Sequence, residues 1–195
     1  MNDGSIESTE EALRIALAYF PVVEVPDEAD IEVVSRQIGR RPSGMFFVVN
    51  RCLRGKPQVI LTLPRVGGGA TPPLLWLCCP QLNKQVGALE SEGAIGRYRE
   101  RLEREPVSKE RFLEEEGSLA LAHSGMARAL GGDELDRVLG PRGASGGRPG
   151  AVKCLHAHLA FRLATGEGTP GAWCLEELCG GAWQGCDRPN EVCID

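Results

Sequence analysis

The chain has 195 residues, of which 42% are hydrophobic, 25% charged and 5% aromatic, and its formal net charge at pH 7 is -5. A chain of this length buries enough surface to fold without disulfides or a metal, so its eight cysteines call for another explanation. The longest apolar run, residues 74–79, is too short to cross a membrane, and the acidic first residues differ from a secretory signal, so we expect a cytoplasmic protein.

The apolar pattern predicts three parts along the chain. Residues 1–27 form an acidic arm with a short helix, which a capping box at Ser8 and Glu11 opens. Residues 28–172 form a single α+β domain, and residues 173–195 form a cysteine-rich tail.

A small antiparallel sheet is expected near the centre of the domain. After a helix over about 28–38, the β-rich runs 45–49 and 58–63 predict a hairpin, and 74–79 predicts a third strand. Several helices pack around this three-stranded sheet, with a glycine-rich linker over 140–150. The further helices are expected over 80–92, 94–105, 107–130, 151–164 and 171–179.

A thiol and two imidazoles lie within five positions at the start of the helix expected over 151–164. On a regular helix Cys154 and His158 share a face, whereas a distorted first turn would bring His156 to Cys154 instead. Thiolate and imidazole together suit a zinc or iron ion. A buried cysteine with surface histidines is the alternative.

Two further cysteines stand at the ends of expected elements. Cys52 follows the first strand, and Cys79 precedes Pro80 at the expected start of a helix, where the helix dipole favours a thiolate. The leading hypothesis is that Cys52, Cys79 and Cys154 converge with His156 or His158 on one metal or reactive-thiol site. Strand alternation assigns Cys78 to the core.

The tail offers a second, weaker metal candidate. Its ligands would be Cys174, Cys179, Cys186 and Cys193, but the paired CxxC spacing of typical zinc sites is missing. Free thiols in a disordered tail are the competing interpretation.

Residues 37–89 hold seven basic residues and no acidic one, which predicts a positive surface. A small anionic ligand such as phosphate would then contact Arg51, Arg54 and Lys56 in the hairpin, with Arg148 and Lys153 beside the glycine-rich linker. In the alternative, the acidic N-terminal arm lies over this surface. The acidic composition and the lack of interleaved aromatic residues disfavour nucleic acid as a partner.

Four motifs carry a resemblance to a known family. They are Arg51-Cys52-x-x-Gly55-x-Pro57-x-Val59, Trp76-Leu77-x-Cys79-Pro80-x-Leu82, Leu89-Glu90-x-x-Gly93 and Lys153-Cys154-Leu155-His156. Over about residues 30–172 the chain resembles the bacterial family catalogued as domain of unknown function number five hundred and one. The resemblance groups Cys52, Cys79, Cys154 and His156, and it implies no reaction.

Three function classes follow from these patterns. The first is a metal or thiol site, and the second is an anion-binding enzyme or sensor with His156 as general acid or base. The third is a non-catalytic interaction module in which the acidic helices over 94–130 present a face to a partner. The sequence contains no recognisable order of nucleophile, base and acid, so it does not decide whether the protein is an enzyme.

Overall fold

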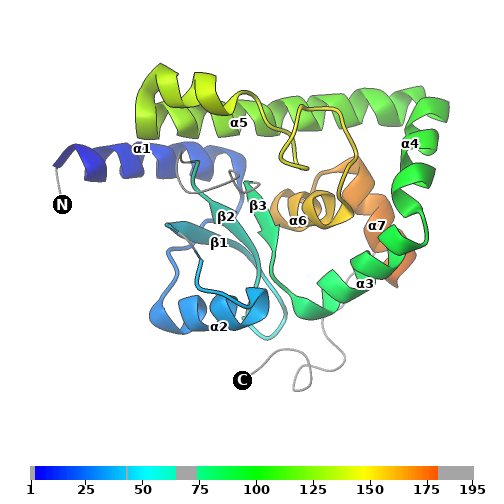
Figure 1. Ribbon diagram of the computed structural model, residues 1–195, viewed down its shortest axis with the longest axis horizontal. Helices are drawn as coiled ribbons and strands as arrows, with labels where there is room; N and C mark the ends of the chain where they lie inside the picture. Colours follow the sequence, from blue (N-terminus) through cyan, green and yellow to red (C-terminus); the bar gives the residue numbers. More distant parts are fainter. Residues whose placement is uncertain (1–2, 43, 65–73, 180–195) are drawn as a thin grey trace.

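A three-stranded antiparallel sheet lies between helices in the computed structural model, which describes residues 3–42, 44–64 and 74–179 (Figure 1). The strands β1 (Phe46–Arg51), β2 (Pro57–Thr62) and β3 (Leu75–Leu77) follow that order across the sheet. The α+β class predicted from the sequence is confirmed. The helices are α1 (Asp3–Tyr19), α2 (Glu28–Ile38), α3 (Pro80–Ser91), α4 (Ala94–Arg104), α5 (Pro106–Leu139), α6 (Leu155–Thr165) and α7 (Thr169–Cys179).

The sheet separates a large core from a small one. Strand residues with their side chains on one face, among them Val59 and Leu61, join the core that α1 and α3 to α7 complete. Val48, Ile60 and Cys78 face the other side and pack against α2. This alternation confirms that Cys78 is a core residue, and its burial raises the pKa of the thiol to about 12.

The helix starts differ from the predicted ones in two places. Helix α1 begins at Asp3, so Ser8 lies inside the helix, and the capping box expected there is wrong. A capping box does occur at the start of α2, where the Asp27 side chain accepts from the Asp30 N–H and Asp30 reaches back to the Asp27 N–H.

Helices α3 and α6 position the residues discussed below. Cys79 is the N-cap of α3 and Pro80 its first residue, as predicted. Helix α6 begins at Leu155 rather than at 151, because Cys154 has an extended backbone with φ -148° and ψ 117°. The polypeptide therefore enters α6 through Cys154 as its N-cap.

Helix α5 runs beyond the predicted end at 130. It reaches Leu139, but Gly131 and Gly132 have non-helical dihedral angles, and Gly132 adopts a positive φ of 67°. The final turns thus fold back over the long part of the helix (Figure 1). Among the described residues, no helix combines the length and the apolar character that a membrane span requires.

Candidate metal centre

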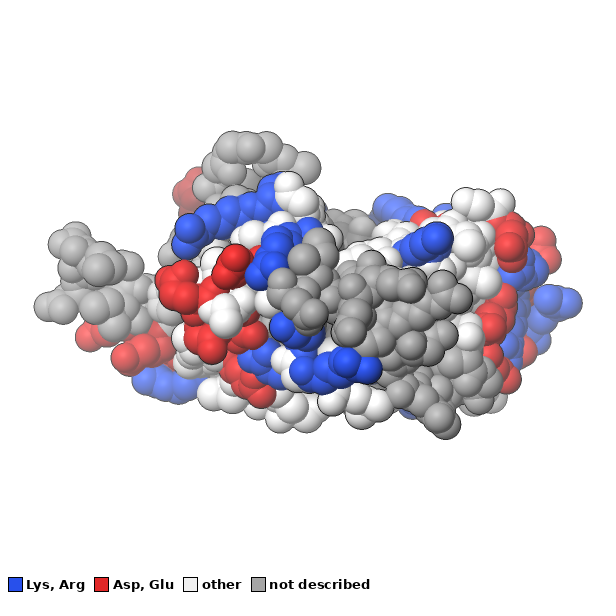
Figure 2. All heavy atoms as spheres, turned by 90° about the horizontal axis from the view of Figure 1, so that it is seen from below, with Lys and Arg blue, Asp and Glu red and all other residues white. Residues whose placement is uncertain are grey.

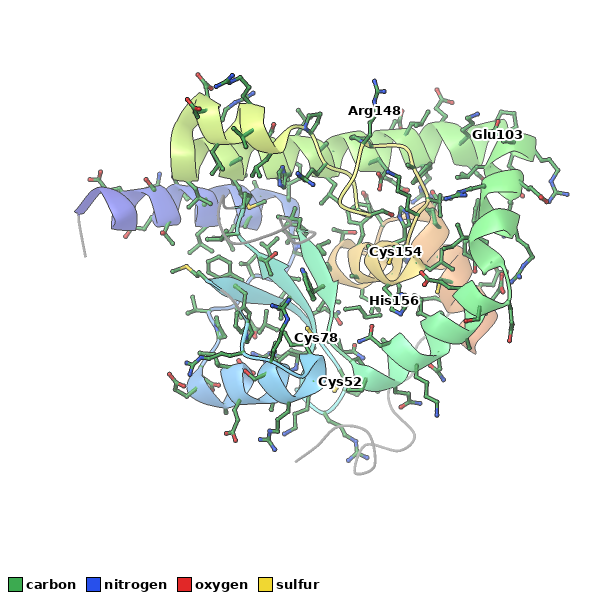
Figure 3. All side chains as sticks on the ribbon, viewed as in Figure 1. Cys52, Cys78, Glu103, Arg148, Cys154 and His156 are labelled. Atoms are coloured by element: carbon green, nitrogen blue, oxygen red, sulfur yellow. The ribbon has the colours of Figure 1, made fainter. Side chains whose placement is uncertain are left out.

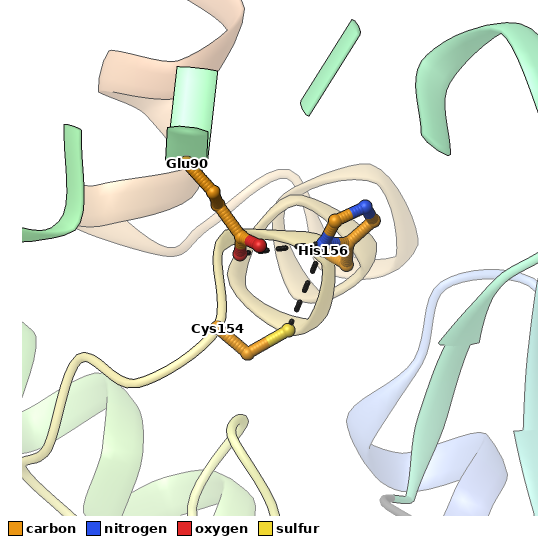
Figure 4. A group of neighbouring side chains, drawn as sticks. All are labelled: Glu90, Cys154 and His156. Carbon is orange, nitrogen blue, oxygen red and sulfur yellow. Dashed lines mark hydrogen bonds and ion pairs between the residues drawn. The ribbon is translucent and has the colours of Figure 1, made fainter. Parts of the chain in front are cut away.

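Three different ligand types meet where the end of α3 approaches the start of α6 (Figure 4). Glu90 lies in the last turn of α3. Cys154 occupies the N-cap position of α6, and His156 lies in the first turn of α6. The Sγ atom of Cys154 is 3.8 Å from His156 Nδ1, which is 3.3 Å from Glu90 Oε1. One ligand atom from each residue lies within 4.8 Å of the other two.

Glu90 is held in place by the helix that it faces. Its Oε1 atom accepts a hydrogen bond of 2.5 Å from the backbone N–H of Leu155. Leu155 is the first residue of α6. The four N–H groups at a helix start lack partners within the helix, and the helix dipole there favours a negative charge. Glu90 thus caps α6 from α3 and keeps its carboxylate beside His156.

His156 is oriented by a backbone carbonyl. Its Nε2 atom lies 3.1 Å from the carbonyl oxygen of Asn83, which can only accept, so Nε2 carries a proton and donates it. The hydrogen bond with Cys154 raises the pKa of His156 to about 9, the Asn83 carbonyl and the Glu90 charge act in the same direction, and burial opposes them. Nδ1 therefore faces the thiol and the carboxylate.

The spacing of these atoms suits a tetrahedral metal ion. Zinc bonds of about 2.3 Å to sulfur and about 2.1 Å to nitrogen and oxygen place sulfur and nitrogen about 3.6 Å apart at tetrahedral angles, and nitrogen and oxygen about 3.4 Å apart. The observed separations are 3.8 Å and 3.3 Å. A metal-binding histidine commonly donates its other N–H to a carbonyl, as His156 does.

A cavity of about 410 Å³ adjoins this group, and both Cys154 and His156 line it. Leu75 to Leu77 of β3 form part of its wall, together with Ile38 at the end of α2. The side chains of Glu90 and His156 are 25% and 29% exposed, so the group lies at the cavity rather than inside the core. A ligand in the cavity would reach it directly.

Two of the predicted cysteine ligands are not members of this group. Cys52 lies in the β1–β2 turn, where its N–H donates to the Lys56 carbonyl, and Figure 3 shows it well away from Cys154. Cys79 is 2% exposed and belongs to the large core. Among the described residues, the only group of three ligand types close enough for one metal is Glu90, Cys154 and His156.

The His158 side chain is buried on the interior face of α6. Its Nε2 atom is 3.0 Å from the Ser145 hydroxyl, its ring meets Phe112 edge to face, and its side chain is 1% exposed. Burial lowers the pKa of His158 to about 4, so the ring is neutral at physiological pH. Of the two histidines that the sequence left open, the structure brings His156 to Cys154.

The predicted anion-binding hairpin is partly neutralised by acidic side chains. Arg51 donates to both carboxylate oxygens of Asp30 at 2.7 Å and to Glu24 at 2.6 Å. Arg54 is exposed and Lys56 half-buried in the same turn. Acidic and basic side chains lie next to one another over the face shown in Figure 2. Glu24 and Asp30, which precede β1, thus neutralise Arg51, and an anion site at Arg54 and Lys56 stays a prediction.

The glycine-rich linker surrounds a carboxylate that belongs to the chain itself. Glu116 of α5 accepts the N–H of Ala144 at 3.0 Å and that of Gly150 at 3.2 Å, and burial raises its pKa. Arg148 is exposed and points away from Cys154 (Figure 3). The Lys153 ammonium lies beside Gly147. Two linker amides that an external anion would need are therefore already bound.

The tail cysteines divide into two groups. Cys174 is fully buried in α7 and joins the large core, beside Trp173 and Leu175. The side chain of Cys179 and all of Cys186 and Cys193 lie outside the described residues. The second metal candidate stays a prediction.

Glu90 is the ligand that the sequence analysis did not assign. It appears in one of the four motifs, but it lies 65 residues from Leu155 in the sequence, and only the packing of α3 against α6 brings it to His156. A single carboxylate near the end of a helix gives no separate signal of a site.

Comparison with known proteins adds a family. A family model described as "Protein of unknown function (DUF501)" matches residues 48–176, which include all three members of the group. No curated protein and no solved structure matches the chain.

Proposed function

The chain belongs to the family described as protein of unknown function (DUF501), and we propose that Glu90, Cys154 and His156 bind a divalent transition metal, with zinc as the preferred ion. The observation that carries this proposal is the convergence of thiol, imidazole and carboxylate atoms within 4.8 Å. Zinc accepts all three ligand types in a tetrahedral site. Iron is the other metal expected from the sequence, and metal analysis of the purified protein distinguishes it from zinc.

The surroundings of the three ligands support an open rather than a closed site. Structural zinc sites have four protein ligands, whereas catalytic sites have three and leave the fourth position to water or substrate. Within the described part of the chain three ligands converge, and two of them, Cys154 and His156, line the cavity. A bound zinc ion would supply a Lewis acid at the cavity wall. Asn83 and Leu155 keep His156 and Glu90 oriented.

Metal analysis of the purified protein tests the proposal. We expect one zinc per chain, loss of that zinc in Cys154→Ser, and a thiolate-to-cobalt charge-transfer band when cobalt replaces zinc. Cys52→Ser is the matched control, since Cys52 is also half-buried but lies outside the group. A protein that takes up neither metal, or a Cys154→Ser variant that keeps full zinc content, would overturn the proposal.

A reactive thiol at Cys154 is the second candidate, because the same geometry serves it without a metal. The neighbouring imidazole, whose Nδ1 lies 3.8 Å from the Cys154 Sγ atom, is the kind of partner that activates a cysteine nucleophile. This function predicts that iodoacetamide modifies Cys154 faster than Cys52, and that His156→Gln removes the difference. Equal rates for the two thiols would contradict it.

The proposal includes the cytoplasmic location expected from the sequence. Cys154 can bind a metal or act as a nucleophile only in its reduced form, which the cytoplasm maintains. Neither Cys52 nor Cys154 forms a disulfide.

A further inference from the structure

We infer that the cavity beside Glu90, Cys154 and His156 takes an uncharged amide-type ligand with an apolar body, whose carbonyl end reaches the metal. The inference rests on the proposed function and deepens it by naming a ligand class. Its three supports are the apolar wall of the cavity, the absence of charged side chains from that wall, and the hydrogen-bonding groups left at its polar end.

The wall of the cavity is mostly apolar. Ile38, Trp76 and Ala157 line it from α2, β3 and α6, together with the leucines on either side of Trp76. A volume of about 410 Å³ falls within the range of about 300–1,000 Å³ typical of small-molecule sites. An aromatic or branched aliphatic group would therefore find both the space and an apolar surface.

Charged ligand bodies are disfavoured because the wall offers them no partner. Apart from the site residues Cys154 and His156, the described lining residues have no ionisable side chain. A charge moved from water into such a cavity without a counter-charge loses hydration that nothing replaces. The body of the ligand should be neutral.

Two side-chain amides at the cavity each donate one hydrogen bond to a backbone carbonyl. Asn83 Nδ2 donates to the Leu77 carbonyl at 3.0 Å, and Gln37 Nε2 donates to the Pro57 carbonyl at 3.1 Å. The Gln37 carbonyl oxygen is buried and has no hydrogen-bond partner among the described residues. Each side chain therefore keeps a second N–H and its carbonyl oxygen, which can pair with an acceptor and with an N–H or O–H donor on a ligand. A carboxamide carries such a donor next to a carbonyl oxygen that can bind a metal.

Three hydroxamates test the ligand class on the zinc-loaded protein. Acetohydroxamate has the metal-binding head alone, benzohydroxamate adds an apolar ring, and 4-carboxybenzohydroxamate adds a charge to that ring. Burial of a phenyl ring should tighten binding about 10- to 100-fold over acetohydroxamate, measured by calorimetry. The added carboxylate should cancel this gain. Equal affinity for acetohydroxamate and benzohydroxamate, or no loss with the charged ring, would overturn the inference.

Two variants locate the apolar body in the cavity. Ala157→Leu fills space beside the ligand and should weaken benzohydroxamate at least about 10-fold while zinc content stays at the wild-type level. Ala88→Leu, an exposed position on α3, is the matched control and should change nothing. Ile38→Lys places a positive charge at the cavity and should reverse the preference between the two aromatic hydroxamates. Unchanged binding in both cavity variants would place the ligand elsewhere.

Failure of this inference can be told apart from failure of the metal proposal. If the protein binds no zinc, benzamide, which lacks the chelating head, should still quench the fluorescence of Trp76 in the metal-free protein, and Trp76→Phe should remove the response. Zinc binding with no discrimination among the hydroxamates refutes the ligand class alone. Absence of zinc binding together with a benzamide response refutes the metal alone.

Discussion

His156 donates its Nε2 proton to the carbonyl oxygen of Asn83, over a distance of 3.1 Å. The two residues are 73 positions apart in the sequence, and their contact fixes which imidazole nitrogen is free. Because Nε2 is occupied by the hydrogen bond to Asn83, a metal ion and a proton compete with each other for Nδ1. This atom lies between the sulfur of Cys154 and the carboxylate of Glu90.

This competition makes metal affinity depend on pH. The pKa of His156 is raised to about 9, chiefly by its hydrogen bond with Cys154, so the ring holds a proton on Nδ1 at pH 7 that the metal displaces. Zinc affinity should rise about tenfold per pH unit for each displaced proton from pH 6 until about 9, measured by competition with a chromophoric chelator. Cys52→Ser should show the same slope, whereas a flat profile would exclude His156 as a ligand.

The same protonation stabilises the metal-free fold. A group whose pKa is raised on folding contributes stability below its unfolded value of 6.5, and this contribution disappears as the pH rises through about 9. The stability difference between the wild type and His156→Gln in chelator should therefore shrink between these pH values.

Glu90 has two roles that substitutions can separate. Glu90→Gln keeps an acceptor for the Leu155 N–H but removes the charge, so zinc affinity should fall more than about tenfold with little change in melting temperature. Glu90→Ala should in addition lower the free energy of unfolding by about 1 kcal/mol, because α6 loses its cap. Glu92→Gln, an exposed carboxylate two residues away, is the control for both measurements. Zinc affinity unchanged in Glu90→Gln would remove Glu90 from the ligand set.

Gly143→Ala should destabilise the protein severely. A Cβ atom at Gly143 would lie 1.8 Å from Glu116 Oε2 and 3.1 Å from the backbone of Pro149, so the carboxylate must leave the linker amides. The expected loss is about 2–4 kcal/mol in urea unfolding. Gly117→Ala on α5, where a Cβ meets nothing within 4 Å, should instead stabilise by about 0.5–1 kcal/mol. Similar effects of the two substitutions would contradict this account of Gly143.

Arg51→Gln should lower the free energy of unfolding at pH 7 by about 1–2 kcal/mol. This range already allows for solvent screening of the ion pair, because the Arg51 side chain is 27% exposed. Arg51 holds the pKa of Asp30 below its usual value of 3.8, so its contribution is present above that pH and is lost as Asp30 becomes protonated. The destabilisation should therefore fade in acid. The exposed Arg54→Gln should cost less than about 0.5 kcal/mol, and an equal loss in the two variants would assign Arg51 no special role.

Local patterns were sufficient for most of the fold. Periodicity and turn residues located the three strands and the helix starts at Glu28 and Pro80, because these depend on neighbours in the sequence. The capping box at Ser8 failed, since the segment before it is also helical. Gly131 and Gly132 were expected to end a helix, but the chain resumes a helical path after them.

The candidate site was predictable only in part. Cys154 and His156 are close in the sequence, and the extended Cys154 backbone selects His156 over His158. Glu90 and Asn83 enter through the packing of α3 against α6, which no pattern along the chain encodes. Cys79 has the predicted N-cap position, but its side chain is buried in the core.

Glu116 also determines how the glycine-rich linker can respond to solutes. Its carboxylate is part of the chain, so free phosphate would have to displace it from the Ala144 and Gly150 amides before binding there. Release of these amides would also leave Glu116 buried without its two donors. Glu116 of α5 thus holds the linker that leads into α6 through hydrogen bonds from within the chain, without an added solute.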